Sequence, residues 1–362
     1  MSEAPALKEL FNAARFQHIA HELAALHPGF DAARFLELSL AEMEELSLMQ
    51  RLRRMTESLH ATLPADYRKT VAILRQLAPR INRGFVTLVL PDYTALYGLD
   101  DFQASMDALK FFTPFGSSEF AIREFLRRDL SRTLAVMETW SRDPDEAVRR
   151  LASEGSRPRL PWSFRIEALV ADPTPVVVIL ENLKADPSLY VRKSVANHLN
   201  DITKDHPDWV LDRLEKWPLN NPHTAWIVKH ALRTLIKKGN QRALAIIGAG
   251  EEPEVLIHGF KVKPREIRLG DRITLSFCLE STSQKPQRLV VDYVVHYVKK
   301  SGITSGKVFK LKEFTLGAGE SLSIARSQSI RDFTTRLHHP GRHEVDVVIN
   351  GKSVARDFFQ LG

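Results

Sequence analysis

The amino-acid sequence predicts a chain in two parts: an all-α solenoid of HEAT-like repeats, followed by a C-terminal all-β, immunoglobulin-like sandwich. Two segments that start at Asp143 and Asp186 both read D-P-x-x-x-V-R, 43 residues apart. A period of this length, carried by pairs of helices, is typical of HEAT solenoids. From His258 onward, helical spacing of apolar residues gives way to the two-residue alternation of strands. We therefore expect a helical domain over residues 1–250 and a sandwich over residues 251–362.

The composition is that of a folded cytoplasmic protein. The chain has 362 residues, of which 44% are hydrophobic and 26% charged, values typical of globular domains. Its single cysteine, Cys278, excludes an intrachain disulfide framework. The first residues lack the basic and apolar regions of a secretion signal, and the longest apolar runs are too short to cross a bilayer. We expect no membrane contact.

The positive charge is concentrated in particular regions. The formal net charge is +7, yet residues 1–118 carry 12 basic and 14 acidic side chains. Residues 119–238 carry 20 basic and 17 acidic side chains, and residues 260–362 carry 18 and 10. A regional basic surplus suggests a polyanionic partner, more often nucleic acid than a membrane. A basic protein with no such partner is the alternative.

The first 118 residues are expected to form the amino-terminal end of the helical stack. Apolar residues recur at helical spacing in five segments, residues 7–15, 16–26, 40–63, 66–77 and 102–112. Residues 85–90 are apolar and rich in β-branched side chains, so they fit either a strand or a buried helix. None of these segments carries a recognisable chemical motif.

Two features of the middle of the chain are candidates for function. Glu119 follows two serines that can cap a helix, so it is either a complement to the helix dipole or a functional carboxylate. Residues 153–162, SEGSRPRLPW, interrupt the helical spacing and carry Arg157, Arg159 and Trp162. An irregular stretch of this length between helices is typical of a binding loop. Packing of Trp162 in a buried hinge is the alternative.

The next two helices each present a polar stripe. In residues 186–204, Val191, Val195 and Leu199 face a core, and the stripe on another face consists of Lys193, Asn197, Asp201 and Lys204. Residues 222–238 are expected to form one helix with a cationic stripe of Trp226, Lys229, His230, Arg233 and Lys237. Equivalent helices of a solenoid line one concave surface, so we expect both stripes to lie on it.

The arginines of the repeated motif have a different interpretation. HEAT repeats use an Asp and an Arg to tie one repeat to the next. We therefore interpret Arg149 and Arg192 as structural rather than DNA-binding.

The C-terminal part is expected to contain about seven strands. Alternating segments cover residues 272–280, 288–298, 308–314, 321–327, 344–350 and 354–361, with a hairpin turn at Asn350-Gly351. This number of strands in about a hundred residues is typical of an immunoglobulin-like sandwich. The expected loops, residues 299–312 and 331–342, carry the cations Lys300 and Arg336.

The sequence contains none of the common catalytic fingerprints. There is no P-loop, no G-x-G-x-x-G, no G-x-S-x-G and no H-E-x-x-H. The 13 histidines are scattered and one cysteine cannot build a thiolate zinc site. We expect no cofactor and no metal, so any enzyme here works with carboxylates, aromatic rings and charge.

Four motifs taken together carry a resemblance to a known family. SSEFAIREF, EGSRPRLPW, VRKSVANHLNDI and HALRTLIKKG, in this order, resemble the HEAT-like-repeat DNA alkylation-repair glycosylases, and the β domain resembles the AlkC branch in particular. The resemblance implies a DNA glycosylase that excises cationic N-alkylated bases, notably 3-methyladenine and 3-methylcytosine, from duplex DNA. It also implies that the base is not flipped into a pocket.

The resemblance places Glu119 of SSEF, Trp162 of PRLPW and Asp201 of HLND in a catalytic cleft. We expect a monomer that binds double-stranded DNA containing alkylated bases. The residues expected to contact DNA share a basic, polar or aromatic character: Arg150, Arg157, Arg159, Lys193, Asn197, Lys204, Trp226, Lys229, His230, Arg233, Lys237, Lys300 and Arg336.

The chemistry of such a reaction fits these residue types. An N3-alkylated adenine is already cationic, so it leaves without strong general-acid catalysis. Asp201 or Glu119 could stabilise the oxocarbenium character of the deoxyribose and position water, and the Trp162 indole could stack on the sugar or base. The alternative is a non-catalytic HEAT scaffold that binds nucleic acid or an acidic protein partner.

Overall fold

The computed structural model describes residues 7–81, 84–333 and 336–362. These residues form two compact units, and each is described by itself. The first unit is the chain up to His206 together with Pro218–Ala231, and the second is Pro207–Trp217 together with Leu232–Gly362.

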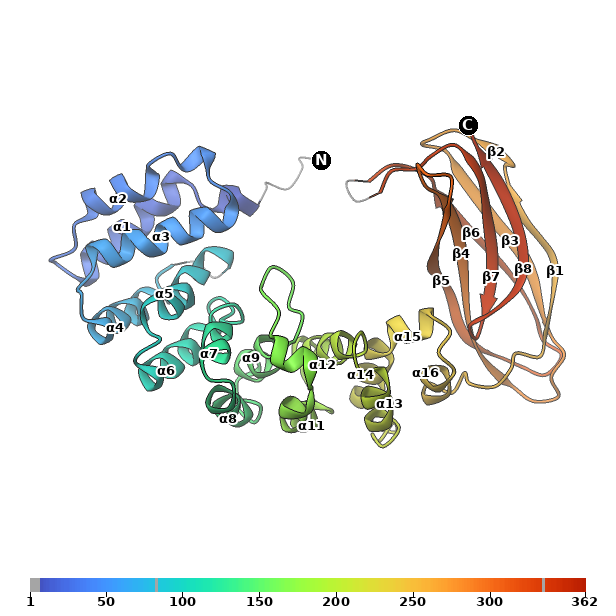
Figure 1. Cartoon of the computed structure of the whole chain (residues 1–362), viewed down its shortest axis with the longest axis horizontal. Helices are drawn as coiled ribbons and strands as arrows, with labels where there is room; N and C mark the ends of the chain where they lie inside the picture. Colours follow the sequence, from blue (N-terminus) through green and yellow to red (C-terminus); the bar gives the residue numbers. More distant parts are fainter. Residues whose placement is uncertain (1–6, 82–83, 334–335) are drawn as a thin grey trace. The chain divides into compact units, whose positions relative to one another are not determined.

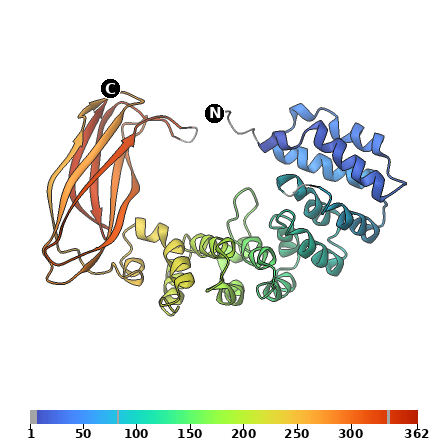
Figure 2. The same cartoon turned by 180° about the vertical axis from the view of Figure 1, so that it is seen from behind.

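The first unit is helical, with successive helices stacked side by side along the sequence (Figures 1 and 2). Short 3-10 helices, labelled η, lie between some of the α-helices. The elements are η1 Leu7–Leu10, α1 Ala13–Leu26, α2 Ala32–Leu40, η2 Met43–Glu45, α3 Leu48–Thr62, α4 Tyr67–Leu77, η3 Phe85–Leu88, α5 Val89–Tyr97, α6 Phe102–Phe112, α7 Ile122–Arg128, α8 Leu130–Trp140, α9 Glu146–Gly155, α10 Glu167–Ala171, η4 Thr174–Val176, α11 Val177–Leu183, α12 Leu189–Ile202 and α14 Pro222–Ala231.

Local sequence fixes where many of these helices begin. At the start of α1, α2, α4, α6 and α8, an Asn or Asp side chain accepts a hydrogen bond from a backbone N–H of the first turn. Such caps satisfy donors that have no partner inside the helix. Apolar residues such as Phe16, Leu59 and Leu74 are buried in the amino-terminal core. The ambiguous run at residues 85–90 is helical, since η3 and α5 cover it.

The repeated D-P-x-x-x-V-R motif has the same local structure in both copies. Arg149 Nη1 donates to the carbonyl oxygens of Asp143 and Pro144, each at 2.9 Å. Arg192 Nη1 makes the equivalent bonds within its own copy, to the Asp186 and Pro187 carbonyls at 3.0 and 2.7 Å. Arg149 Nε also donates to Asp186 Oδ2 at 2.7 Å, which ties one repeat to the next. The tie between repeats is confirmed for Arg149, whereas the bonds of Arg192 lie within its own copy of the motif.

The second unit joins three short helices to the β domain. Its helices are α13 Pro207–Leu214, α15 Arg233–Lys237 and α16 Gln241–Ile246. Arg242 of α16 donates to Asp208 and Asp212 of α13 and to Glu215 just beyond it. The prediction of one helix over residues 222–238 is wrong, because Leu232 separates α14 from α15. This division of the chain does not follow the predicted boundary near residue 250, which stays a proposal.

The β domain is a sandwich of two sheets, and the predicted fold class is confirmed. The strands are β1 Val255–Lys263, β2 Glu266–Ile267, β3 Arg272–Ser281, β4 Gln287–Val298, β5 Thr304–Leu316, β6 Ser321–Ser329, β7 Gly341–Ile349 and β8 Lys352–Leu361. One sheet has the order β1-β3-β6 and the other β2-β8-β7-β4-β5. Neighbours are antiparallel except β2 and β8. Their inward side chains, among them Leu275, Tyr293, Val347 and Phe359, form one core.

In the β domain, the predicted hairpin turn is confirmed and one predicted loop is wrong. Asn350 and Gly351 have φ values of 46° and 81°, the left-handed pair that a tight hairpin between β7 and β8 requires. Residues 299–312 were expected to form a loop, but β5 begins at Thr304 and contains most of them. Alternation is weak there because β5 is an edge strand with many exposed side chains.

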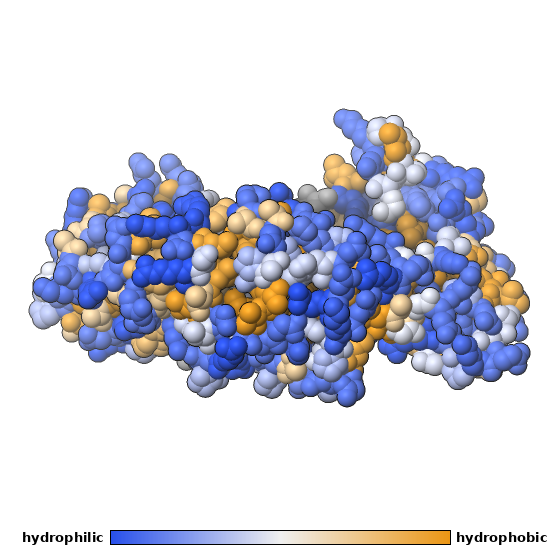
Figure 3. Space-filling model, turned by 60° about the horizontal axis from the view of Figure 1, so that its bottom comes forward, coloured by the Kyte–Doolittle hydropathy of each residue, from blue (hydrophilic) through white to orange (hydrophobic). Residues whose placement is uncertain are grey.

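The face shown in Figure 3 is covered mainly by hydrophilic side chains, with hydrophobic ones gathered in patches between them. Among the residues that the structure describes, no helix combines the length and apolar character needed to span a membrane.

Candidate functional site

An open cleft in the first unit brings together residues from four segments of the chain. The cleft has a volume of about 500 Å³. Apolar and aromatic side chains form much of its wall, and two carboxylates and two arginines are set among them. The lining residues on which the site depends are Phe85, Ser117, Glu119, Phe120, Arg150, Glu154, Arg157, Trp162 and Tyr190.

Glu119 is positioned by contacts rather than by a helix dipole. It lies before α7, which begins at Ile122, so the expectation that it occupies a first helical turn is wrong. Ser117 Oγ donates to Glu119 Oε2 at 2.6 Å, and Arg150 Nη1 donates to the same oxygen at 2.5 Å. These bonds fix the carboxylate at the wall of the cleft.

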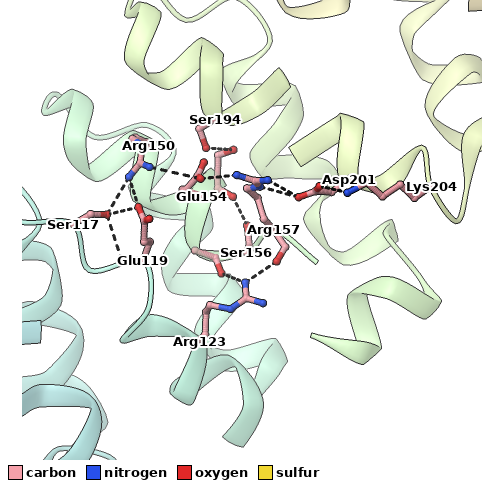
Figure 4. A network of polar contacts seen from close by, with 12 residues as sticks. Ser117, Glu119, Arg123, Arg150, Glu154, Ser156, Arg157, Ser194, Asp201 and Lys204 are labelled. Atoms are coloured by element: carbon pink, nitrogen blue, oxygen red, sulfur yellow. Dashed lines mark hydrogen bonds and ion pairs between the residues drawn. The ribbon is translucent and has the colours of Figure 1, made fainter. Parts of the chain in front are cut away.

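Cations and carboxylates alternate in a polar network that starts at the cleft wall and extends beyond it (Figure 4). Beyond Glu119, the other side of Arg150 approaches Glu154 Oε1 at 3.6 Å. Arg157 Nη1 donates to the same Glu154 oxygen at 2.6 Å, and Arg157 Nε donates to Asp201 Oδ2 at 2.8 Å. Lys204 Nζ donates to Asp201 Oδ1 at 2.9 Å. Three cations and three carboxylates therefore balance in one connected network.

The network keeps its arginines charged although they are largely buried. Burial lowers the pKa of Arg150, but the nearby Glu119 and Glu154 outweigh it, so the net shift is upward. The same balance holds for Arg157, whose pKa burial lowers and Glu154 and Asp201 raise further. His198, which is fully buried nearby, is neutral because burial lowers its pKa to about 3.

The three carboxylates differ in how their oxygens are used. Both oxygens of Asp201 accept hydrogen bonds, one from Arg157 and one from Lys204. Among the described contacts, Glu119 accepts through Oε2 alone and Glu154 through Oε1 alone. Asp201 and Glu154 are similarly buried, 4% and 6% exposed, but only Glu154 lines the cleft. The Asp201 carboxylate is thus buried between Arg157 and Lys204, and the catalytic role expected of it stays a prediction.

Trp162 projects from the loop that follows α9. Its side chain is 68% exposed, so packing in a buried hinge is excluded. Its ring lies edge-on to Phe85, with centroids 6.3 Å apart. The backbone φ of 65° is in the left-handed region, which costs a residue with a Cβ about 1–2 kcal/mol. Strain of this kind clusters at functional sites.

Only some of the residues predicted to contact DNA lie at the cleft or in its polar network. Arg150 and Arg157 line the cleft, Lys204 joins the network through Asp201, and Arg159 pairs with Asp205 at 2.7 Å. On α12, Lys193 is exposed and Asn197 half-buried. On α14, Trp226 stacks on His230 with ring centroids 3.7 Å apart, and Lys229 is half-buried. Arg233, Lys237, Lys300 and Arg336 belong to the second unit, so their contribution to a shared surface stays a prediction.

Two residues of the cleft were missed by the sequence analysis. Glu154 was taken as part of an irregular loop, but α9 continues to Gly155 and places Glu154 in its last turn. Arg150 and Arg157 lie four residues before and three residues after it, a spacing that pairs opposite charges on a helix face. Tyr190, at the start of α12, is half-exposed across from this turn, with the Arg150 guanidinium 4.6 Å from its ring centre. Burial raises the Tyr190 pKa.

Comparison with known proteins assigns both parts of the chain. A family described as "DNA alkylation repair enzyme" matches residues 113–235, and "Uncharacterised protein YhaZ, C-terminal Ig-like domain" matches residues 256–362. "Uncharacterized protein YhaZ" of Bacillus subtilis (strain 168) is 43% identical over 347 residues, which cover 96% of each chain. The solved structure of Pseudomonas fluorescens alkylpurine DNA glycosylase AlkC, bound to DNA containing an abasic site analog, is 61% identical, with a TM-score of 0.96.

The chain belongs to the AlkC branch of the DNA alkylation-repair enzymes. The likeness to the Pseudomonas fluorescens structure covers 99% of this chain and 100% of that one. It therefore includes the helical unit with its cleft as well as the β domain. In this AlkC-branch chain the matched helical segment, residues 113–235, contains Glu119, Glu154, Trp162 and Asp201.

Proposed function

We propose that the protein is a DNA glycosylase of base excision repair that hydrolyses the N-glycosidic bond of cationic N-alkylated bases. The expected substrates are 3-methyladenine and 3-methylcytosine in duplex DNA. One observation carries the proposal: an exposed tryptophan and two carboxylates, each with an oxygen not bonded to protein, share a cleft in a chain similar to an alkylpurine DNA glycosylase.

The electrostatics of the cleft suit a leaving group that is already positive. Glu119 and Glu154 place negative charge where the deoxyribose acquires oxocarbenium character, and preorganised charge of this kind is worth most where water is excluded. The same carboxylates accept a hydrogen bond from an attacking water. The Trp162 indole offers its face to the cationic base or the sugar. Asp201 contributes through Arg157, which it holds in place.

The flanking cations suit the backbone of the same substrate. Lys193 on α12, Lys204 just after it and Arg159 on the loop after α9 are at least partly exposed, and such residues neutralise phosphates. We propose that the alkylated base is excised without entering an enclosed pocket, because Trp162 is too exposed to seal one. A monomeric protein acting on DNA in the cytoplasm is the corresponding expectation.

Release of free base by the purified protein tests this function. Incubation with methylated duplex DNA is expected to release 3-methyladenine, detected by chromatography. A duplex containing hypoxanthine, a neutral lesion, is expected to stay intact because no strong general acid lines the cleft. Binding without any base release would favour a non-catalytic scaffold. Efficient hypoxanthine release would contradict the reliance on a charged leaving group.

A further inference from the structure

Arg123, in the first turn of α7, is an arginine with no exposed surface. Among the described residues it has no carboxylate within ion-pairing distance. Burial, with a further contribution from the nearby charge of Arg157, lowers its pKa to about 10. A buried cation without a paired carboxylate is costly to a fold unless other groups solvate it. What solvates Arg123 therefore indicates its role.

Three backbone carbonyls solvate the guanidinium: one belongs to the last residue of α9, and two belong to the loop that carries Trp162. Nη1 donates to the carbonyl oxygens of Gly155 at 3.0 Å and of Arg157 at 2.6 Å. Nη2 donates to the carbonyl oxygen of Phe164. The Phe164 ring centre lies 5.3 Å from the guanidinium carbon. One side chain thus joins the residues before Trp162 to those after it.

The segment it joins is a compact loop with close ends. We name residues 156–166 the Trp162 loop. Its base is closed by the Ile166 N–H, which donates to the Pro158 carbonyl at 3.1 Å, and the Ser163 N–H donates to Leu160 at 3.3 Å. Loops of this kind are packed by their own contacts and often carry function.

A glycine brings Arg123 and this loop together. An added Cβ at Gly155 would lie 2.5 Å from Ile122 Cγ2, the residue next to Arg123. Only the absence of a side chain lets the end of α9 approach the start of α7 this closely. The approach puts the Gly155 carbonyl within reach of the guanidinium.

We propose that Arg123 is a positioning residue that locks the Trp162 loop in the conformation that presents Trp162 and Arg157 to the cleft. The left-handed backbone at Trp162 is unfavourable by itself, so it persists only where surrounding contacts over-determine it. The three bonds from Arg123, on both sides of Trp162, supply that constraint. Arg123 does not itself line the cleft, so its effect on excision passes through the loop. This inference rests on the proposed function.

The chain supplies a matched control in Arg127. It lies one turn further along α7 and also packs on the Phe164 ring, with its guanidinium carbon 5.0 Å from the ring centre. Arg127 is exposed and pairs with Glu124, and it bonds no carbonyl of the loop in the described contacts. Arg123→Met and Arg127→Met therefore remove similar side chains, but only Arg123→Met removes the hydrogen bonds that hold the Trp162 loop.

The rate of cleavage by trypsin measures how firmly the Trp162 loop is held, and the experiment needs no DNA. The bonds after Arg159 and Arg165 are the cleavable ones, because Pro158 protects the bond after Arg157. We expect Arg123→Met to be cut at these two sites at least about tenfold faster than the unaltered protein, by mass spectrometry of the fragments, and Arg127→Met to be cut at the unaltered rate. Arg123→Lys, which keeps the charge but not the planar fork, is expected to be cut at an intermediate rate.

Single-turnover release of 3-methyladenine measures how the loss of Arg123 affects excision. We expect Arg123→Met to be about a hundredfold slower, since misplacing a catalytic group by about 1 Å costs this much, while its Kd for undamaged duplex stays within about twofold. An unchanged cleavage pattern, or a freed loop with full excision, would overturn the proposal. If the unaltered protein released no base, the proposed function would fail, and the trypsin comparison would still decide whether Arg123 holds the loop. Arg123→Lys answers the same questions if Arg123→Met does not fold.

Discussion

At the scale of single residues, the carboxylates of the cleft differ in what they can still offer a substrate. Within residues 7–81, 84–333 and 336–362, Glu119 and Glu154 each engage the protein through one oxygen, which leaves the other for the sugar or a water. Asp201 uses both oxygens on cations. We therefore propose that the two glutamates stabilise the transition state directly and that Asp201 acts on the position of Arg157.

Glutamine substitutions test this division. Glu119→Gln and Glu154→Gln are each expected to slow single-turnover excision of 3-methyladenine by about two to three orders of magnitude, the scale of one preorganised electrostatic group. Binding to undamaged duplex should hold or tighten, because a charge that repels phosphate is gone. Asp201→Asn is expected to slow excision less than either, since only the anchor of Arg157 is altered.

Asp205→Asn is the control, because Asp205 is an exposed carboxylate bonded to Arg159 at 2.7 and 2.9 Å. It should leave excision within about twofold. Full activity in both glutamine variants would refute the catalytic assignment, and a larger loss in Asp201→Asn than in either would return the direct role to Asp201.

The sequence led us to expect Glu119 and Trp162 in the cleft but not Glu154. The cause is the local sequence around Glu154. The Gly155-Ser156 pair followed by two prolines reads as irregular chain, which hides the last turn of α9. Helical spacing put Asp201 on a polar stripe with Lys193 and Lys204, but it says only which residues share a face, not what packs on that face. The Arg157 that buries Asp201 comes from a loop 44 residues away, a contact that no periodicity reports.

At the scale of elements, the tie between repeats through Arg149 should be a strong determinant of stability. Arg149→Met removes the pair with Asp186, which is largely buried, and two bonds to carbonyls. It is expected to lower the free energy of unfolding by about 2–4 kcal/mol, since the Asp186 carboxylate is left buried without its partner. Denaturant unfolding measures this loss.

Arg68→Met provides the comparison, because Arg68 pairs with Asp101 at the surface. Exposed pairs contribute about 0.2–1 kcal/mol, so this variant should change stability by less than about 1 kcal/mol. Equal losses in the two variants would mean that the Arg149 tie does not join the repeats as described.

The β domain is expected to show a pH-dependent stability that originates at Asp292 on β4. Burial raises the pKa of Asp292 to about 6, although Lys310 and Lys237 oppose the shift. Between about pH 4 and pH 6 the folded chain binds this proton more tightly than the unfolded chain does. The contribution of Asp292 to stability is therefore greatest below pH 4 and is lost as the pH rises through 6.

Asp292→Asn removes this dependence. Relative to the unaltered protein, the variant should gain up to about 1–2 kcal/mol of stability between pH 4 and pH 7, after allowance for partial exposure of the group. Thermal unfolding at several pH values measures the difference. If the stability difference between the variant and the unaltered protein did not change with pH, the pKa of Asp292 would not be raised by folding.

The elements also differ in how far the sequence predicts them. Strands β3, β4, β6 and β8 alternate clearly because one face packs on a single core, and their predicted ranges are close to those observed. The alternation around His258 was noted, but β1 was not assigned a range, since it is an edge strand with a bulge between His258 and Lys261. The break between α14 and α15 was missed because Leu232 continues the apolar stripe across it.

At the scale of the whole molecule, the basic surplus of residues 260–362 predicts that the β domain adds to DNA affinity. Lys300 is exposed at the turn between β4 and β5, and the Arg336 guanidinium lies 5.0 Å from the centre of the Tyr297 ring. The double variant Lys300→Gln/Arg336→Gln should bind undamaged duplex more weakly. The slope of log K against log salt should become shallower by about 2, if each cation neutralises one phosphate.

Lys261→Gln controls for the loss of charge itself, because Lys261 is an exposed cation of β1 that was not predicted to contact DNA. Its salt slope should match that of the unaltered protein. An unchanged slope in the double variant would remove Lys300 and Arg336 from the DNA-binding surface.

The left-handed backbone at Trp162 has a consequence for how such a chain changes over time. Asn and Gly adopt this conformation more readily than Trp, so drift toward a more stable fold would replace the indole. Only a demand for the indole opposes that drift. Descendants released from the need to process DNA should therefore accumulate Asn or Gly here early, while Arg149 and Asp186 persist. The residue at position 162 would then distinguish homologues that still process DNA from homologues that have kept only the fold.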